Sequence, residues 1–385
     1  MPKKKDAVPV GRIDYKSLIN KKSGGANAYN LKDKNPTEVK EWIPTGSRWL
    51  DASICLGQMA GIPVGKISKI AGLSSTGKSL LALIIAANAQ KMGIKVFYFD
   101  SEAAMDPSFA EAIGVDLDEM VYIQAESTEM VLETVEMLTA ADDVKKLFIW
   151  DSIANTPCKA EIESDFNPGS HVGLKPRILS QGFKKLTDPL ANSDNTFLLL
   201  NQLKTLIPKN HFEAMANMSD PWFEPGGLAP GYQASLSIRL VTRKSKSGQV
   251  FDENGFLIGC EVKAMINKSR FGSVGRQCTF NIIFRDDPVG IRDEESWFHA
   301  ILASDRIQSP SKGWYQIDGG KKFRESEWNK MMEDPEFRNT VRDIVDEEHI
   351  TKFANRSSKA TATYDIDADL PDDGGEGGAP ATAEE

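Results

Sequence analysis

One short segment constrains the fold of this chain more than any other. The eight residues Gly72–Ser79, GLSSTGKS, fit the pattern G-x-x-x-x-G-K-[ST] at every fixed position. They follow a β-like run, Val64–Ala71, and lead into an apolar helical run that Gly93 ends. A glycine-rich loop between a strand and a helix presents backbone N–H groups to phosphate, so the segment predicts a P-loop nucleotide site.

The P-loop prediction gives specific roles to two side chains. The Lys78 ammonium is expected to reach the β- and γ-phosphate oxygens, and the Ser79 hydroxyl is expected to be a ligand of Mg²⁺. The backbone of the loop contacts the phosphates. The residues expected at the nucleotide are Gly72, Leu73, Ser74, Ser75, Thr76, Gly77, Lys78 and Ser79.

Three continuous apolar runs that end in polar residues predict the rest of the sheet. They are Lys95–Asp100, Lys146–Asp151 and Thr196–Gln202, and they alternate with helical patterns. Such runs are typical of parallel strands covered on both faces. The expected fold class is therefore α/β: a P-loop ATPase core with a mostly parallel twisted sheet, an N-terminal arm and a small C-terminal α/β domain.

Three polar side chains stand at or just after the carboxyl ends of these strands, where ligands of open α/β sheets bind. Asp151 is a candidate Mg²⁺ ligand, with a helix N-cap as the alternative. Glu102 can orient and deprotonate an attacking water, or it is a solvated loop acid. Gln202 can bond the γ-phosphate and report it to the following loop, or it only stabilises a turn.

The remaining pattern is coarser. Leu203–Gly227 reads as a long irregular stretch, which in a compact domain is functional or disordered. Strands dominate from Ala234 to Phe284, and helical patterns follow from Asp293. Near the N-terminus, Asp14–Lys22 predicts a short helix.

Composition and charge limit the classes of protein. The four cysteines are scattered, which favours a reducing compartment and argues against structural zinc. The longest apolar run falls short of the ~20 residues that span a bilayer, and no signal peptide is evident. The net charge of −9 is unevenly spread: residues 360–385 hold eight acids and no base, whereas residues 1–40 hold ten bases and four acids. Such ends are either solvated disorder or interaction tails.

Length and these composition shifts predict four segments. Residues 1–45 are expected to form a basic arm or oligomerisation segment, and residues 46–290 the P-loop ATPase core. Residues 291–355 form a small C-terminal domain, and residues 356–385 form an acidic disordered tail.

Several motifs, in order and at matching spacing, resemble the RecA recombinase family, including its bacterial RecA and phage UvsX branches. The resemblance runs from about Ile43 to Gly227, and a weaker match continues to about Trp328. The segments that carry it are IPTGSRWLDASI, GKISKIAGLSSTGKS, VFYFDSEAAMDPSFAEAIGVD, DSIANTPCKAEIES, SHVGLKPRILSQGFKKL, NTFLLLNQ and a final GG.

The resemblance implies an ATPase that uses ATP and Mg²⁺. In that reading Glu102 is the water-activating base, Lys78 binds phosphate, and Gln202 senses the γ-phosphate. It also implies that Asp106 and Phe109 lie near the nucleotide base.

The resemblance further implies two DNA-facing loops, Glu161–Gly173 and Leu203–Gly227. The second loop carries Trp222 and Phe223, which either stack on bases or pack against the core. The expected partners are single-stranded and double-stranded DNA, with a single-strand-binding or mediator protein as a further possibility. The residues expected to bind DNA are Arg177, Lys184, Lys204, Gly226 and Gly227.

A helical filament of identical subunits is also implied, in which each subunit completes its neighbour's ATP site. The family pattern Lys-Asn-Lys reads Ile266, Asn267, Lys268 in this chain, so Lys268 is the residue expected to act in trans. The retained lysine supports such a contact, and the isoleucine departs from the pattern.

The expected function is ATP-dependent DNA strand exchange, in a bacterial or phage-infected bacterial cytoplasm. A ring-forming ATPase of the helicase or KaiC type is the alternative within the fold, because rings and filaments share head-to-tail interfaces. A P-loop small-molecule kinase and a non-catalytic ATP-binding filament protein are alternatives from other classes.

Overall fold

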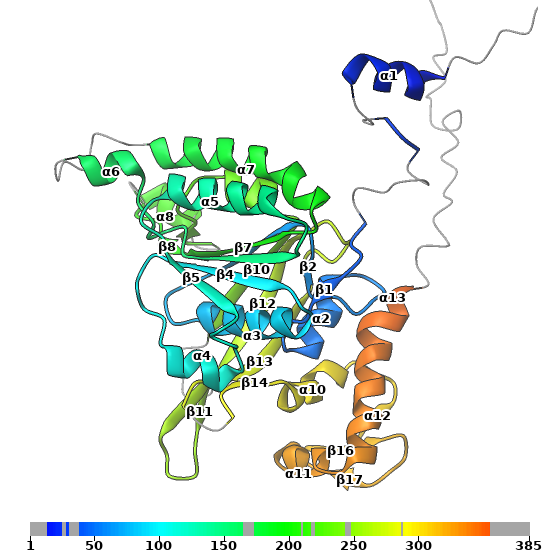
Figure 1. Ribbon diagram of the computed structural model, residues 1–385. Coiled ribbons are helices and arrows are strands. Elements are labelled where there is room, and N and C mark those ends of the chain that lie inside the picture. The colour runs from blue at the N-terminus through cyan, green and yellow to red at the C-terminus, as the bar shows by residue number, and fades with distance from the viewer. Residues whose placement is uncertain are drawn as a thin grey trace, which may run out of the picture.

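A large twisted sheet forms the centre of the computed structural model, which describes residues 14–24, 28–30, 38–164, 173–208, 211–216, 220–242, 248–285 and 288–354 (Figure 1). Six neighbouring strands of this sheet are parallel. In spatial order they are β10 (Leu236–Thr242), β3 (Ile67–Gly72), β7 (Thr196–Gln202), β6 (Lys146–Asp151), β4 (Lys95–Asp100) and β5 (Met120–Gln124).

Beyond β10 the sheet continues with antiparallel strands. They are β12 (Leu257–Ser269), β13 (Gln277–Ile283) and β14 (Gly290–Arg292), and β11 (Gln249–Phe251) pairs with β12 alone. The predicted α/β class is confirmed, and three of the six parallel strands are the apolar runs found in the sequence. The three strand ranges Lys95–Asp100, Lys146–Asp151 and Thr196–Gln202 are the observed ones.

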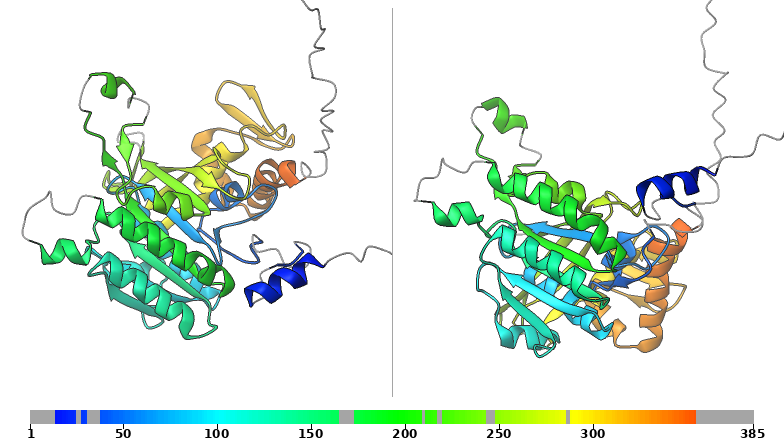
Figure 2. Two further views of the ribbon diagram at one scale, coloured as in Figure 1. Left: turned by 90° about the horizontal axis from the view of Figure 1, so that it is seen from above. Right: turned by 45° about the horizontal axis from the view of Figure 1, so that its top comes forward.

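Helices cover both faces of the parallel strands, as Figures 1 and 2 show. The apolar helix α3 (Lys78–Lys91) lies on one face, and α5 (Thr128–Ala141), α7 (Leu174–Asn192) and α9 (Ala229–Gln233) lie on the other. Because both faces are covered, strand side chains such as Trp150 and Phe197 are fully buried, and their rings stack in the α5–α7 core.

Short elements complete the core region. They are α2 (Arg48–Ile54), α4 (Pro107–Ile113), α6 (Lys159–Glu163), and the strand pair β1 (Trp42–Ile43) and β2 (Ile62–Pro63). Helix α1 (Tyr15–Ser23) begins at the N-cap Asp14 and buries no residue. In both views of Figure 2 it stands apart from the sheet.

The C-terminal part of the described chain is a small α/β layer. Its elements are α10 (Asp293–Ile301), β15 (Ile307–Ser311), β16 (Trp314–Ile317), β17 (Lys322–Phe323), the 3-10 turn η2 (Glu325–Glu327), α11 (Trp328–Met332), α12 (Pro335–Asp346), the π-helical turn η3 (Glu347–Thr351) and α13 (Lys352–Ala354).

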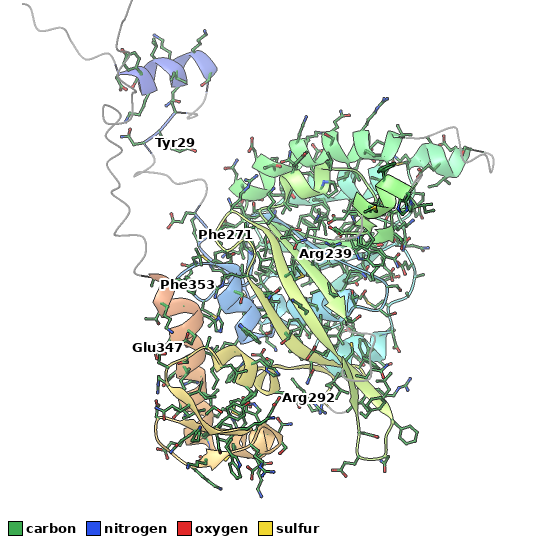
Figure 3. The ribbon with its side chains drawn as sticks, turned by 180° about the vertical axis from the view of Figure 1, so that it is seen from behind. Tyr29, Arg239, Phe271, Arg292, Glu347 and Phe353 are labelled. Atoms are coloured by element: carbon green, nitrogen blue, oxygen red, sulfur yellow. The ribbon has the colours of Figure 1, made fainter. Side chains whose placement is uncertain are left out.

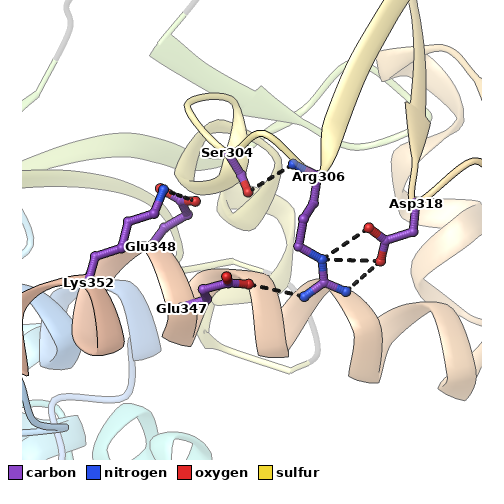
Figure 4. A network of polar contacts seen from close by, with 6 residues as sticks. All are labelled: Ser304, Arg306, Asp318, Glu347, Glu348 and Lys352. Atoms are coloured by element: carbon purple, nitrogen blue, oxygen red, sulfur yellow. Dashed lines mark hydrogen bonds and ion pairs between the residues drawn. The ribbon is translucent and has the colours of Figure 1, made fainter.

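Aromatic rings and one arginine hold this layer together. Phe298 and Phe323 both pack against Trp328, with ring centroids 5.3 and 6.0 Å apart. The Arg306 guanidinium donates to both Asp318 and Glu347, which joins β16 to the end of α12 (Figure 4). The helical segment continues through η3 to α13, which contains Phe353, labelled in Figure 3. The boundary predicted at residue 291 implies that this layer is a separate domain. That boundary stays a prediction.

Two buried carboxyl groups join the start of the core to the C-terminal layer. Asp51 of α2 accepts hydrogen bonds from the backbone N–H and hydroxyl of Thr45, at 3.0 and 2.7 Å. Asp293 of α10 accepts from the Arg48 backbone and from the Trp297 indole, both at 2.7 Å. Burial raises the pKa of Asp51 from 3.8 to about 8, and the nearby negative charge of Asp293 adds to this.

This raised pKa predicts that the protein becomes less stable as pH rises from about 4 to about 8. A carboxyl whose pKa is raised by folding favours the folded state only while it is protonated, and the slope is at most about 1.4 kcal/mol per pH unit. In Asp51→Asn this contribution is absent. We therefore expect the difference in free energy of unfolding, variant minus wild type, to increase as pH rises from 5 to 7.5. Denaturant titration measures it.

Asp318→Asn is the matched control. Its ion pair with Arg306 lowers the pKa of Asp318, so this carboxylate is ionised in both states throughout that pH range. A constant difference between Asp51→Asn and wild type over the range would contradict the assignment.

Candidate functional site

The carboxyl ends of four neighbouring parallel strands meet at one cleft of about 260 Å³. Gly72 of β3 lies opposite Gln202 of β7, and Asp100 of β4 lies opposite Asp151 of β6. Of the residues predicted at the nucleotide or its metal, those lining the cleft are Ser74, Ser75, Lys78, Ser79, Glu102, Asp106, Phe109, Asp151 and Gln202. Gly72, Leu73, Thr76 and Gly77 shape the loop without lining the cleft in the described structure.

The sequence of the P-loop explains its backbone. Gly77 has φ +80°, and a Cβ there would lie 2.4 Å from Cδ1 of Ile282, so a larger residue would meet both strain and a clash. The Lys78 ammonium folds back and donates to the Leu73 carbonyl at 2.7 Å. Burial lowers the pKa of Lys78, and the carboxylates of Asp151 and Glu102 oppose that shift.

The Ser79 hydroxyl and the Asp151 carboxylate are in direct contact, as a shared metal site requires. Ser79 Oγ donates to Asp151 Oδ2 at 2.6 Å. Within the described ranges no group of three or more His, Cys, Asp or Glu side chains could hold a metal by itself. Mg²⁺ commonly binds one or two protein ligands together with substrate phosphates and water. The Ser79–Asp151 pair fits this arrangement.

Tyr98 is a second partner of Asp151 that the sequence reading missed. Its hydroxyl donates to Asp151 Oδ2 at 2.7 Å from inside β4. Burial raises the pKa of Asp151, whereas the hydrogen bonds from Ser79 and Tyr98 lower it. Tyr98 is two positions before Asp100 and therefore lies on the same face of the strand. This spacing is the sequence signal that could have identified Tyr98 as a residue of the site.

Asp100 organises the loop that carries Glu102. The buried Asp100 carboxylate accepts from the backbone N–H groups of Glu102, Ala103, Ala104 and Met105, at 2.8 to 3.2 Å. The sequence reading treated Asp100 only as the end of a strand. The bonds fix the backbone at Glu102 while its side chain stays exposed to water and accepts a hydrogen bond from Asn155.

Asp106 and Phe109 border the same cleft at the start of α4. The Asp106 carboxylate accepts from the backbone of Ser108 and Phe109 and thus caps the helix, as its position before Pro107 indicates. The cap holds the half-buried Phe109 ring at the cleft wall. Their role at the nucleotide base stays a prediction.

The stretch after Gln202 contains three short regular elements, so the prediction of an irregular stretch is wrong for these and holds for the other described residues. Strands β8 (Lys204–Thr205) and β9 (Trp222–Phe223) pair with each other, and α8 (His211–Ala216) lies between them in sequence. Of the two aromatic residues, Trp222 is half-buried and Phe223 is 42% exposed. Lys204 is exposed.

The other residues predicted to bind DNA lie on or against α7. Arg177 and Lys184 are exposed and two turns apart, so they share one face of the helix. Gly226 and Gly227 have φ values of +93° and +75°, and any side chain on them would clash with α7. Of the predicted loop Glu161–Gly173, residues 165–172 lie outside the described residues. In Figure 1, helices α6 and α8, which lie in the described parts of the two loops, are both on the left of the view.

Lys268 of β12 does not line the cleft of its own chain. Its ammonium donates to the carbonyls of Gly231 and Tyr232 at the end of α9, at 2.8 and 2.7 Å. Ile266 of the same strand is buried, and Asn267 is exposed. Lys268 is therefore held on a different part of the surface from the cleft it was predicted to complete in a neighbouring subunit.

None of the described helices is long and apolar enough to cross a membrane.

Comparison with known proteins places the chain in a family. The RecA N-terminal domain family matches residues 14–289. Protein RecA of Saccharopolyspora erythraea is 31% identical over 331 residues, which are 86% of this chain and 89% of that protein. Protein RecA of Rubrobacter xylanophilus is 32% identical over 84% of this chain, and that of Ectopseudomonas oleovorans is 29% identical over 92%. With the family match covering the whole parallel sheet and the cleft, the chain belongs to the RecA family of recombinases.

Proposed function

We propose that this protein is a DNA-dependent ATPase that forms helical filaments on single-stranded DNA and pairs it with homologous duplex. One observation carries the proposal. Gln202 lines the ATP cleft, and the exposed Lys204 of the DNA-facing loop follows it by two residues. A change at the γ-phosphate can therefore be passed to Lys204 at the start of this loop through a single residue of backbone between them.

The chain's own residues support hydrolysis of ATP at this cleft. The Lys78 ammonium has three donors and uses one on Leu73, so donors remain for phosphate oxygens. The Glu102 carboxylate, with Asn155 donating to it, accepts a proton from the attacking water. Ser79 and Asp151 would hold Mg²⁺, which neutralises charge on the phosphates.

Backbone contacts by exposed cations support binding to DNA. Arg177, Lys184 and Lys204 offer charge to phosphates, which predicts salt-sensitive binding that depends little on sequence. The exposed Phe223 offers a ring on which a base can stack. The duplex as second partner rests on the family alone.

The exposed apolar face of α1 supports assembly of identical subunits. Tyr15, Leu18 and Ile19 are each at least half exposed, and no residue of α1 is buried. A groove on a neighbouring copy would cover these side chains. Head-to-tail contacts of this kind give open filaments or closed rings, so a ring-forming ATPase is the second candidate.

ATP hydrolysis measured with and without single-stranded DNA tests the proposal. We expect DNA to raise turnover at least tenfold, and we expect electron microscopy of the same mixture to show helical filaments. Turnover that ignores DNA would overturn the recombinase assignment, and closed rings would favour the second candidate.

Glu102→Gln should abolish turnover while nucleotide affinity is largely retained. The substitution keeps the size of the side chain and its contact with Asn155 but removes the base, so a loss of about a hundredfold or more is expected in turnover. Lys78→Ala should weaken nucleotide binding as well, because phosphate loses its cationic partner. Wild-type turnover in Glu102→Gln would show that another group is the base.

Lys268→Ala should act across the subunit interface. An excess of the variant should be mixed with wild-type protein. DNA-dependent hydrolysis should then fall by more than the variant's share of the subunits, because each variant subunit would disable a neighbour's site. Lys185→Ala, an exposed lysine of α7 paired with Glu136, is the control. Activity in strict proportion to the wild-type fraction would contradict an action in trans.

A further inference from the structure

A buried lysine lies on the strand that leads into the P-loop. Lys69 is in the middle of β3, and its side chain is 5% exposed. Ile67, two residues earlier, packs into the α5–α7 core, so Lys69 points to the same face of the sheet, where α9 covers it. A charged side chain at such a place needs a partner, because burying an unpaired ammonium is strongly unfavourable.

The partner of Lys69 is Glu224, from the returning part of the second DNA-facing loop. The Lys69 ammonium donates to Glu224 Oε2, and the Glu224 side chain is 29% exposed. The two residues are 155 positions apart in sequence. Arg239 of β10, labelled in Figure 3, makes a second and more exposed ion pair with Asp220 of the same loop.

The surroundings make Glu224 the balancing charge. Gly231 of α9 lies beside the lysine, since a Cβ there would be in ordinary contact with the Lys69 ammonium nitrogen, at 3.8 Å. Lys268 donates to the carbonyl of the same Gly231. Burial lowers the pKa of Lys268, and the positive charges of Arg270 and Lys69 lower it further. Of these three cations, Lys69 is the one whose ion pair with an acid is observed among the described residues, and that acid is Glu224.

The pair also joins two functional parts of the molecule. Three residues after Lys69, Gly72 begins the P-loop, and its carbonyl accepts the backbone N–H of Leu203 at the start of the loop. One residue after Glu224, the Pro225 carbonyl accepts from the Asn201 side chain of β7 at 2.9 Å. Both ends of the second loop are therefore attached to β3 and β7, two of the four strands that meet at the ATP cleft.

We propose that Lys69 and Glu224 are a positioning pair that couples the ATP cleft to the second DNA-facing loop. The inference rests on the proposed function, because it assigns a route for the response of hydrolysis to DNA. The Gln202 end of the loop lies at the ATP cleft. The Lys69–Glu224 contact fixes the opposite end to β3, the neighbour of β7. With that end released, movement at Gln202 is no longer passed to the whole loop.

Glu224→Gln tests the pair, since it removes the charge and keeps the size. We expect hydrolysis without DNA to stay within about twofold of wild type, and we expect stimulation by single-stranded DNA to fall about fivefold or more, the usual lower range of coupling between sites. The ratio of DNA affinities with and without a non-hydrolysable ATP analogue should fall in the same proportion. Glu136→Gln, which breaks the exposed pair with Lys185, is the matched control and should change neither quantity.

The double variant Lys69→Met/Glu224→Gln separates coupling from stability. It removes the buried unpaired charge, so it should fold even if Glu224→Gln alone is unstable, and its loss of stimulation should match that of Glu224→Gln because the two residues act as a unit. Wild-type stimulation in a folded Glu224→Gln or in the double variant would overturn the inference. Absence of stimulation in the wild type would instead overturn the proposed function, and the coupling with it.

Discussion

The parallel pairing of β3 between β7 and β10 is the constraint on which the rest of this molecule depends. A parallel strand has its carboxyl end on the same edge of the sheet as its neighbours. The side chains that follow each strand therefore lie close together, although they are far apart in the sequence. The P-loop, Gln202 and Asp151 come from three separate strands and share one cleft for this reason. Helices on both faces are required because parallel strands of this kind are apolar on both sides.

The features of fold and site that could be predicted from sequence are those that local chemistry determines. The three apolar runs form strands with the predicted bounds, because a short and continuously apolar segment fits a strand that is buried on both faces. Asp106 caps its helix because aspartate is favoured at the N-cap and proline at the first helical position. The direct contact of Ser79 with Asp151 follows from strand order, which alternating strands and helices already restrict.

The features that sequence did not reveal are pairings between distant, individually ordinary residues. Tyr98 reads as one more aromatic residue of a buried strand, and only the fold places its hydroxyl on Asp151. Asp100 reads as the end of a strand, yet its carboxylate holds four backbone N–H groups. Lys69 departs from the apolar pattern of β3, but nothing in the sequence points to an acid so far along the chain. The β8–β9 pair is too short to leave a periodic signal.

The exposed helix α1 has a consequence for how the chain reaches its final structure. A helix of nine residues is too short to be stable by itself in water, because nucleation of the first turn outweighs the few hydrogen bonds that follow. The N-cap Asp14 and the left-handed Gly24 close its two ends, but its apolar side chains Tyr15, Leu18 and Ile19 remain at least half exposed. In the proposed assembly, the surface of a neighbouring subunit supplies the missing free energy. Ordering of this arm and association of subunits would then be a single equilibrium.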